Sequence, residues 1–179
     1  MPAILDLIRG LADYEKLSDQ AVATEAQLTS ALFPADGAAA AAHCVLGRVD
    51  GVPVAFALYF FNFSTFLGKP GLYLEDLFVT PEHRGRGLGK ALLLHLAAIA
   101  NARGCGRMEW AVLDWNVDAI AFYESLGATR MPEWQLCRLT GPALARYGRG
   151  RPESGLGARA SGLGEPRTEP RNRTLKNEP

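Results

Sequence analysis

Apolar positions in the first part of the chain recur with helical spacing. They fall at Ile4, Leu7, Ile8, Leu11 and Ala12. This is the stripe of an amphipathic helix, and it predicts a first helix over about residues 2–17. A second, shorter helix is expected over about residues 24–32, where Thr24 and Gln27 have the spacing of a capping box.

The middle of the chain has the pattern of strands. Residues 43–49 and 53–62 form two apolar runs separated by Asp50-Gly51, a strong signal for a tight hairpin turn. A third strand is predicted over about residues 71–79. These three segments predict an antiparallel meander.

The second half of the chain alternates between the two patterns. A long helix is predicted over about residues 87–103 and a strand over 107–115. A further helix is expected to start at the N-cap Asn116 and to stop at Gly127. A last strand is predicted over about residues 133–139.

The composition changes after Tyr147. The 179-residue chain is long enough for one ordinary domain, but its last 32 residues are rich in Gly, Pro, Arg and Glu. Such a segment buries too little apolar surface to offset ordering at roughly 1–2 kcal/mol per residue. We therefore expect a folded domain over residues 1–147 and a disordered tail over 148–179.

Charge and cysteine content narrow the function classes. Residues 1–147 carry 12 basic and 15 acidic side chains, a net charge of −3, which disfavours a nucleic-acid partner and suits a small cationic ligand. The three cysteines lack metal-ligand spacing, so no metal is expected. The sequence has no run of 18 or more apolar residues, and its N-terminus lacks the basic and hydrophobic regions of a signal peptide. We therefore expect a cytoplasmic protein without a membrane partner.

A glycine-rich loop, RGRGLG at residues 84–89, stands between a predicted strand and the long helix. A Walker A loop is excluded because Gly89-Lys90 is followed by Ala91 in place of Ser or Thr. The GxGxG spacing fits a dinucleotide fold poorly. Two interpretations of the motif remain. The loop binds an anion through backbone amides at a helix N-terminus, or it is a glycine-rich turn whose basic residues are only solvated.

Five motifs in order resemble the GNAT superfamily of acetyl-CoA-dependent N-acetyltransferases, and more narrowly its diamine (spermidine/spermine or thialysine) acetyltransferase branch. They are LADYEKLSDQ at 11–20, YLEDLFV at 73–79, RGRGLG at 84–89, AVLDWN at 111–116 and FYESLGA at 122–128. The resemblance implies an α/β fold with a mixed, twisted, mostly antiparallel sheet and helices on both faces. The family has another strand before the first helix, so either this start is not the natural one or an edge strand is missing.

The resemblance also implies where acetyl-CoA binds. The acetyl and pantetheine arms would lie along the main chain of Leu77, Phe78 and Val79. The pyrophosphate would bind the glycine loop, and Asn116 and Tyr123 would contact coenzyme A. The loop residues in this set are Arg84, Gly85, Arg86, Gly87, Leu88, Gly89 and Lys90.

The acceptor implied by the resemblance is a small cationic amine, polyamine or lysine-like. Glu75 is the candidate base for the amine, and Tyr123 is the candidate acid for the departing thiolate. In an unbulged strand, Asp76 would point away from Glu75. The candidate acceptor-binding residues are Tyr14, Glu15, Glu75, Glu109, Trp110 and Ala111. A homodimer is implied, and a protein N-terminus or lysine as acceptor, or a non-catalytic acyl-CoA sensor, stay open as alternatives.

Overall fold

The computed structural model describes residues 1–35 and 37–148. The predicted disorder of residues 148–179 therefore lies outside the described residues, except for Gly148. The chain divides into two compact units, Met1–Ala128 and the residues from Thr129 onward. The sheet and four of the α-helices belong to the first unit, and the second unit is described separately below.

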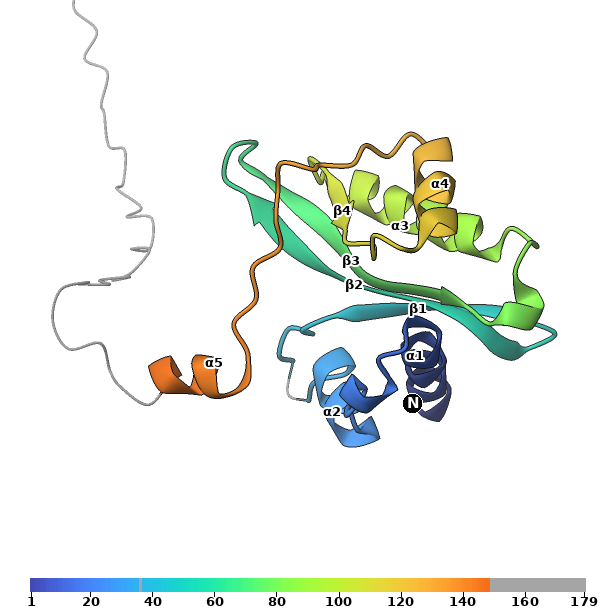
Figure 1. The fold of residues 1–179 in the computed structure, drawn as a ribbon, viewed down its shortest axis with the longest axis horizontal. Coiled ribbons are helices and arrows are strands. Elements are labelled where there is room, and N and C mark those ends of the chain that lie inside the picture. The colour runs from blue at the N-terminus through green and yellow to red at the C-terminus, as the bar shows by residue number, and fades with distance from the viewer. Residues whose placement is uncertain (36, 149–179) are drawn as a thin grey trace, which may run out of the picture. The chain divides into compact units, whose positions relative to one another are not determined.

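A four-stranded mixed sheet in the order β1-β2-β3-β4 is the centre of the first unit (Figure 1). Strands β1 (His43–Val49), β2 (Val52–Ser64) and β3 (Lys69–Val79) are antiparallel neighbours, and β4 (Met108–Trp110) runs parallel to β3. The turn between β1 and β2 is formed by Asp50 (φ 48°) and Gly51 (φ 81°). The predicted meander and its Asp-Gly turn are confirmed.

Helices cover both faces of this sheet, as predicted (Figure 1). On one face lie α1 (Pro2–Glu15) and α2 (Glu25–Leu32), and on the other lie α3 (Leu88–Ala102) and α4 (Val117–Ser125). The capping box of α2 is present, since the Gln27 amide donates to Thr24 Oγ1 (3.3 Å) and the Thr24 amide to Gln27 Oε1 (2.9 Å). Short 3₁₀ turns, Ser18–Gln20 and Pro81–His83, follow α1 and β3.

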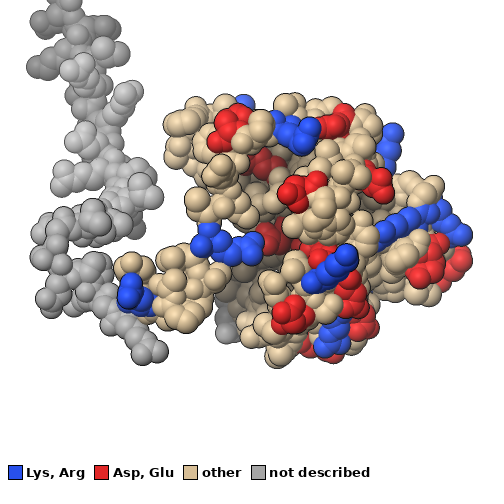
Figure 2. All heavy atoms as spheres, in the orientation of Figure 1, with Lys and Arg blue, Asp and Glu red and all other residues tan. Residues whose placement is uncertain are grey.

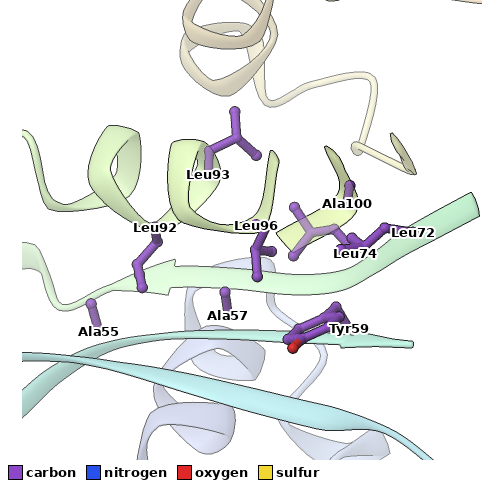
Figure 3. Packing of buried hydrophobic residues seen from close by; sticks show 9 residues of the cluster. All are labelled: Ala55, Ala57, Tyr59, Leu72, Leu74, Leu92, Leu93, Leu96 and Ala100. Atoms are coloured by element: carbon purple, nitrogen blue, oxygen red, sulfur yellow. The ribbon is translucent and has the colours of Figure 1, made fainter. Parts of the chain in front are cut away.

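Two apolar clusters hold the helices on the sheet. The larger one joins β2 and β3 to α3 (Figure 3). Its buried members are Ala55, Ala57, Tyr59, Leu72, Leu74, Leu92, Leu93, Leu96 and Ala100. The smaller cluster joins Leu7 of α1 to Phe56 and Phe78 on the opposite face. Each fully buried large side chain, such as Phe56 or Leu96, contributes about 1.5–3 kcal/mol by removal from water.

Strand β3 contains a β-bulge at Glu75. The β2–β3 register pairs Leu58 with Asp76 but Tyr59 with Leu74, so Glu75 is an extra residue in β3. Leu74 and Leu77 consequently both pack against the α3 cluster, although they are three positions apart. The bulge thereby changes which side chains share a face of the sheet.

The fourth strand is shorter than the sequence predicts. We expected a strand over about residues 107–115, but β4 pairs only Met108–Trp110 with Leu72–Leu74 of β3. The pairing ends immediately before the bulge at Glu75. Past that point the two strands no longer form a ladder, and among the described residues β3 keeps only β2 as a strand neighbour.

The described part of the second unit contains one helix, α5 (Gly141–Gly148). The last strand that we predicted over residues 133–139 is wrong, because this segment has no strand assignment. A strand needs a backbone partner, and an apolar pattern alone does not supply one. Within residues 1–35 and 37–148, the helices all fall short of the length and apolarity that crossing a membrane would require.

Candidate active site

The edge of β3 beyond the bulge offers backbone hydrogen-bonding groups. Leu77, Phe78 and Val79 pair with β2 on one side, and β4 has already ended on the other. An extended, amide-containing ligand pairs with such an edge as another strand would. The geometry therefore suits the pantetheine arm that the sequence assigned to these three residues, and that assignment stays a prediction.

The glycine loop presents its backbone in the way an anion site needs. Gly85 (φ 72°) and Gly87 (φ 79°) have left-handed backbone conformations, and a Cβ at either would meet no atom within 4 Å. The Arg84 amide donates to Pro81 O (3.2 Å), and the next such bond is from the Ala91 amide to Gly87 O (2.9 Å). Within the described residues, the backbone amides of residues 85–90 donate to no backbone carbonyl. They are free for a phosphate at the N-terminus of α3.

Arg84 uses its side chain to attach this loop to the rest of the unit. Its guanidinium lies 4.3 Å from the ring centroid of Tyr14 and 5.7 Å from that of Phe78, and its Nε donates to Val79 O (3.1 Å). Arg84, Arg86 and Lys90 are all exposed. The Arg84 side chain thus has a structural role that the sequence did not indicate.

Tyr14 connects three elements. Beyond its contact with Arg84, its hydroxyl donates to Asn116 Oδ1 (3.3 Å), and its ring lies 5.9 Å from that of Trp115. Asn116 Oδ1 also accepts from the Ala119 amide (3.4 Å), so the predicted N-cap of α4 is confirmed. Tyr14 therefore brings the end of α1, the glycine loop and the start of α4 together.

Three carboxylates interact at the bulge. Burial, together with the charges of Glu75 and Glu15, raises the pKa of Asp76 to about 6. Burial also raises the pKa of Glu15 at the end of α1. From the sequence, Glu75 and Glu15 were expected in the site, whereas Asp76 was expected to point away from Glu75 because a regular strand alternates its side chains. The bulge breaks this alternation, and the charge of Glu75 affects the pKa of Asp76.

Tyr123 lies close to the same group. Burial and, to a smaller extent, the charge of Glu15 raise the pKa of its phenol to about 12. Its ring packs 5.0 Å from that of Trp110 and 5.2 Å from that of Phe122. The structure thus brings together Tyr123, Glu15 and Trp110, three of the residues that the sequence selected from distant segments.

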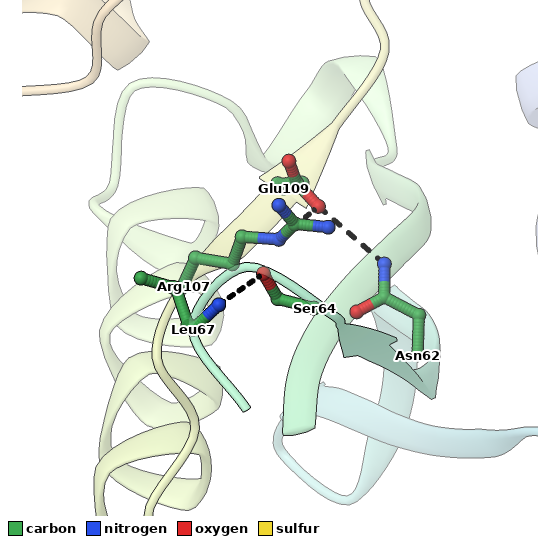
Figure 4. A network of polar contacts seen from close by, with 5 residues as sticks. All are labelled: Asn62, Ser64, Leu67, Arg107 and Glu109. Atoms are coloured by element: carbon green, nitrogen blue, oxygen red, sulfur yellow. Dashed lines mark hydrogen bonds and ion pairs between the residues drawn. The ribbon is translucent and has the colours of Figure 1, made fainter. Parts of the chain in front are cut away.

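Glu109 lies apart from Tyr123. It alternates with Trp110 on β4, and Trp110 packs on the α3 side. Glu109 Oε2 instead pairs with Arg107 Nε (2.8 Å) and accepts from Asn62 Nδ2 (3.4 Å), as Figure 4 shows. Sequence analysis did not select Asn62 and Arg107, which lie outside the five motifs and outside the predicted site.

Charged side chains show no segregation by sign on the face drawn in Figure 2. Asp and Glu occur both at the surface and recessed toward the middle of the view, with Lys and Arg interspersed. Among the described residues, no group of three or more His, Cys, Asp or Glu side chains is arranged to hold a metal ion.

Comparison with known proteins decides the family. Residues 11–128 match the acetyltransferase (GNAT) family, a span that contains the β3 edge, the glycine loop and α4. The chain belongs to the GNAT family. It is accordingly an N-acetyltransferase.

Individual relatives narrow the branch of this GNAT protein. It is 39% identical over 152 residues to thialysine N-epsilon-acetyltransferase of Bos taurus, with 79% of this chain and 87% of the relative covered. It is 52% identical over 95 residues to L-ornithine N5-acetyltransferase of Arabidopsis thaliana, with 53% of this chain and 42% of the relative covered. These similarities support the diamine and thialysine acetyltransferase branch.

Solved structures agree with the GNAT fold. An integron cassette protein from the mobile metagenome of V. cholerae superposes with a TM-score of 0.67 at 26% identity, covering 83% of this chain and 91% of that one. The predicted fold class is therefore confirmed.

Proposed function

We propose that this protein transfers the acetyl group of acetyl-CoA to a primary amine of a small lysine-like or polyamine molecule. The observation that carries the proposal is the end of the β3–β4 ladder at Leu74 and Trp110. Directly beyond it lie the Glu75 bulge and an edge of β3 that, among the described strands, β4 no longer pairs with. A donor and an acceptor can meet there because backbone groups and ionisable side chains adjoin.

The donor would be held mainly by backbone groups. The edge of Leu77, Phe78 and Val79 suits the amides of the pantetheine arm. The amides of residues 85–90 suit the pyrophosphate, with Arg86 and Lys90 adding positive charge. Asn116, at the start of α4, would contact coenzyme A. When bound, acetyl-CoA supplies the activated thioester.

The acceptor amine must lose a proton before it can attack. An alkylamine with a pKa near 10.4 is almost entirely protonated at neutral pH, which adds about 4–5 kcal/mol to the barrier if the neutral form reacts. Glu75 accepts this proton, directly or through water. Glu15 and Asp76 supply further negative charge that attracts the ammonium group. Tyr14, Trp110 and Ala111 line the acceptor side.

Tyr123 donates the proton that the departing thiolate needs. With its pKa near 12, the phenol keeps its proton throughout the working pH range. Such a phenol is a weaker acid than a free tyrosine. Its proton therefore moves only as the carbon–sulfur bond breaks and charge develops on sulfur. Packing against Trp110 fixes the ring for this transfer.

The choice of a small amine as acceptor is supported by relatives. The thialysine and ornithine acetyltransferases act, by their names, on amino acids with a second amine in the side chain. A protein N-terminus or lysine is the alternative acceptor, and a non-catalytic acyl-CoA sensor is the alternative from another class. The proposal further includes a homodimer located in the cytoplasm.

Thiol release from acetyl-CoA tests the proposal. We expect acetyl-CoA-dependent release of free thiol with thialysine, ornithine, lysine or spermidine, and a mass increase of the amine by one acetyl group. Turnover of a peptide but of none of the small amines would support the protein-acceptor alternative. Calorimetric binding of coenzyme A without turnover of any amine would support the sensor.

A further inference from the structure

A second polar site lies next to the proposed transfer site, on the α1 side of the sheet. There the side chains of Arg107 and Glu109 form an ion pair of 2.8 Å, and Asn62 of β2 donates to the same carboxylate oxygen (Figure 4). The Arg107 and Glu109 side chains retain 40% and 42% of their exposure. A cation and an anion thus stand side by side within reach of solvent.

We propose that Arg107 and Glu109, oriented by Asn62, bind the carboxylate and the α-ammonium group of an amino-acid acceptor. This inference rests on the proposed function, and it narrows the substrate class to free amino acids that carry a terminal side-chain amine. A guanidinium binds a carboxylate through two parallel N–H donors, whereas Glu109 pairs with an ammonium group. A zwitterionic head group complements both at once, and a diamine complements only Glu109.

The distance along the sheet fits such an acceptor. Asp76 pairs with Leu58, and Tyr73 pairs with Phe60, so these two positions of β3 are separated by two residues of β2, about 6.6 Å. Glu109 lies beside Tyr73 in the parallel ladder. In an extended lysine, five bonds of about 1.5 Å separate the side-chain amine from Cα by roughly 6 Å. An amine near Glu75 and Asp76 therefore places the head group near Glu109 and Arg107.

Asn62 is held in an orientation that favours Glu109. Its Oδ1 is buried and has no hydrogen-bond partner within the described residues. The reversed amide would direct Oδ1 at the carboxylate, so the observed orientation keeps the donor on Glu109. Gly71 provides the space, because a Cβ there would meet Asn62 Oδ1 at 2.2 Å. A buried acceptor left unpaired is uncommon, and here Asn62 leaves Oδ1 unpaired while its Nδ2 donates to the Glu109 carboxylate (3.4 Å).

Matched acceptors test the proposal on the unmodified protein. Thialysine and ornithine are compared with their decarboxylated counterparts, bis(2-aminoethyl) sulfide and putrescine. We expect kcat/KM to be at least about tenfold higher for each amino acid. Equal or better use of the diamines would overturn the inference while leaving the proposed function standing. Absence of thiol release with every amine would instead defeat the proposed function.

Variants separate the two groups of the site. Arg107→Met should raise KM for thialysine about tenfold or more, with kcat little changed and the diamine kinetics within about twofold. Glu109→Gln should raise KM for both thialysine and the diamine, and should leave Nα-acetyl-lysine unaffected. Arg9→Met, which replaces an exposed arginine of α1, is the matched control and should alter neither.

A purely structural role of Arg107 would give a different pattern. In that case Arg107→Met would lower kcat/KM for amino acids and diamines alike, and this result would overturn the inference. Should that variant fail to fold, Arg107→Lys keeps the charge and the stem but lacks the planar fork. The loss of kcat/KM in this variant should again be confined to acceptors that carry a carboxylate. Unchanged selectivity between amino acids and diamines in a folded Arg107→Lys protein would count against the site.

Discussion

The guanidinium of Arg84 lies 4.3 Å from the ring centroid of Tyr14, and this contact joins the glycine loop to the end of α1. Tyr14 also donates to Asn116 at the start of α4. Since Glu15 follows Tyr14 directly in the chain, the same contact links the glycine loop to a carboxylate whose charge raises the pKa of Asp76 and of Tyr123. A cation–π contact of this kind contributes about 0.5–2 kcal/mol. The contact thereby fixes the glycine loop relative to the end of α1.

Replacement of Tyr123 tests the proton donor. Tyr123→Phe keeps the ring that packs against Trp110 and Phe122 but removes the phenolic proton. We expect kcat to fall about 10²–10⁴-fold, because general acid catalysis contributes that much, with KM for acetyl-CoA nearly unchanged. Tyr147→Phe in α5 is the control. A Tyr123→Phe enzyme with normal kcat would exclude the phenol as the acid.

Replacement of Glu75 tests the base through its pH dependence. Glu75→Gln should reduce kcat/KM at pH 7 by about 10²-fold or more. The deficit should shrink as the pH approaches the pKa of the amine near 10, because the acceptor then loses its proton without help. Initial rates from pH 6.5 to pH 10 measure this. A deficit that stays constant over the whole range would assign Glu75 to binding.

Asp76 links activity to stability. Its pKa is about 3.8 in an unfolded chain and about 6 in the fold, so the folded state binds more protons between these values. The free energy of unfolding therefore decreases as the pH rises from about 4 to about 6, and it stays lower above that. A shift of this size corresponds to on the order of 3 kcal/mol.

Asp76→Asn should remove that pH dependence. At pH 7.5 the variant should be more stable than the parent, whereas near pH 4 the two should unfold alike. Its kcat/KM should be reduced, and the decline of the parent's rate below about pH 6 should disappear, because protonation of Asp76 removes charge from the amine site. Urea unfolding at the two pH values measures the stability. Equal stabilities at pH 7.5 would refute the burial of an ionised Asp76.

The two ends of α3 offer a matched test of the phosphate loop. Gly87→Ala and Gly104→Ala both place a side chain on a left-handed backbone, with φ of 79° and 69°, and neither Cβ meets an atom within 4 Å. Each should therefore cost about 1–2 kcal/mol of stability. Only Gly87→Ala should raise KM for acetyl-CoA, since only Gly87 precedes the free amides. Equal KM values for the two variants would remove the loop from the donor site.

Local patterns in the sequence were sufficient for most elements. The stripe of α1, the Thr24–Gln27 capping box, the Asp50-Gly51 turn and the Asn116 cap each involve residues a few positions apart. Interactions over such short separations depend little on the rest of the fold. The sequence likewise indicated Tyr123, Glu15 and Trp110 as candidate site residues, the first two because they lie in motifs.

The tertiary structure alone decided how these residues share space. The bulge at Glu75 arises from the pairing of β3 with β2, and it ends the β4 ladder and lets Asp76 interact with Glu75. The predicted strand over residues 133–139 lacked a backbone partner. The contact between Asn62 and the Arg107–Glu109 pair joins residues of β2 and β4, and Asn62 and Glu109 are 47 positions apart in the sequence. Strand register and partner choice are long-range properties, because they depend on which backbone groups meet after the chain has folded.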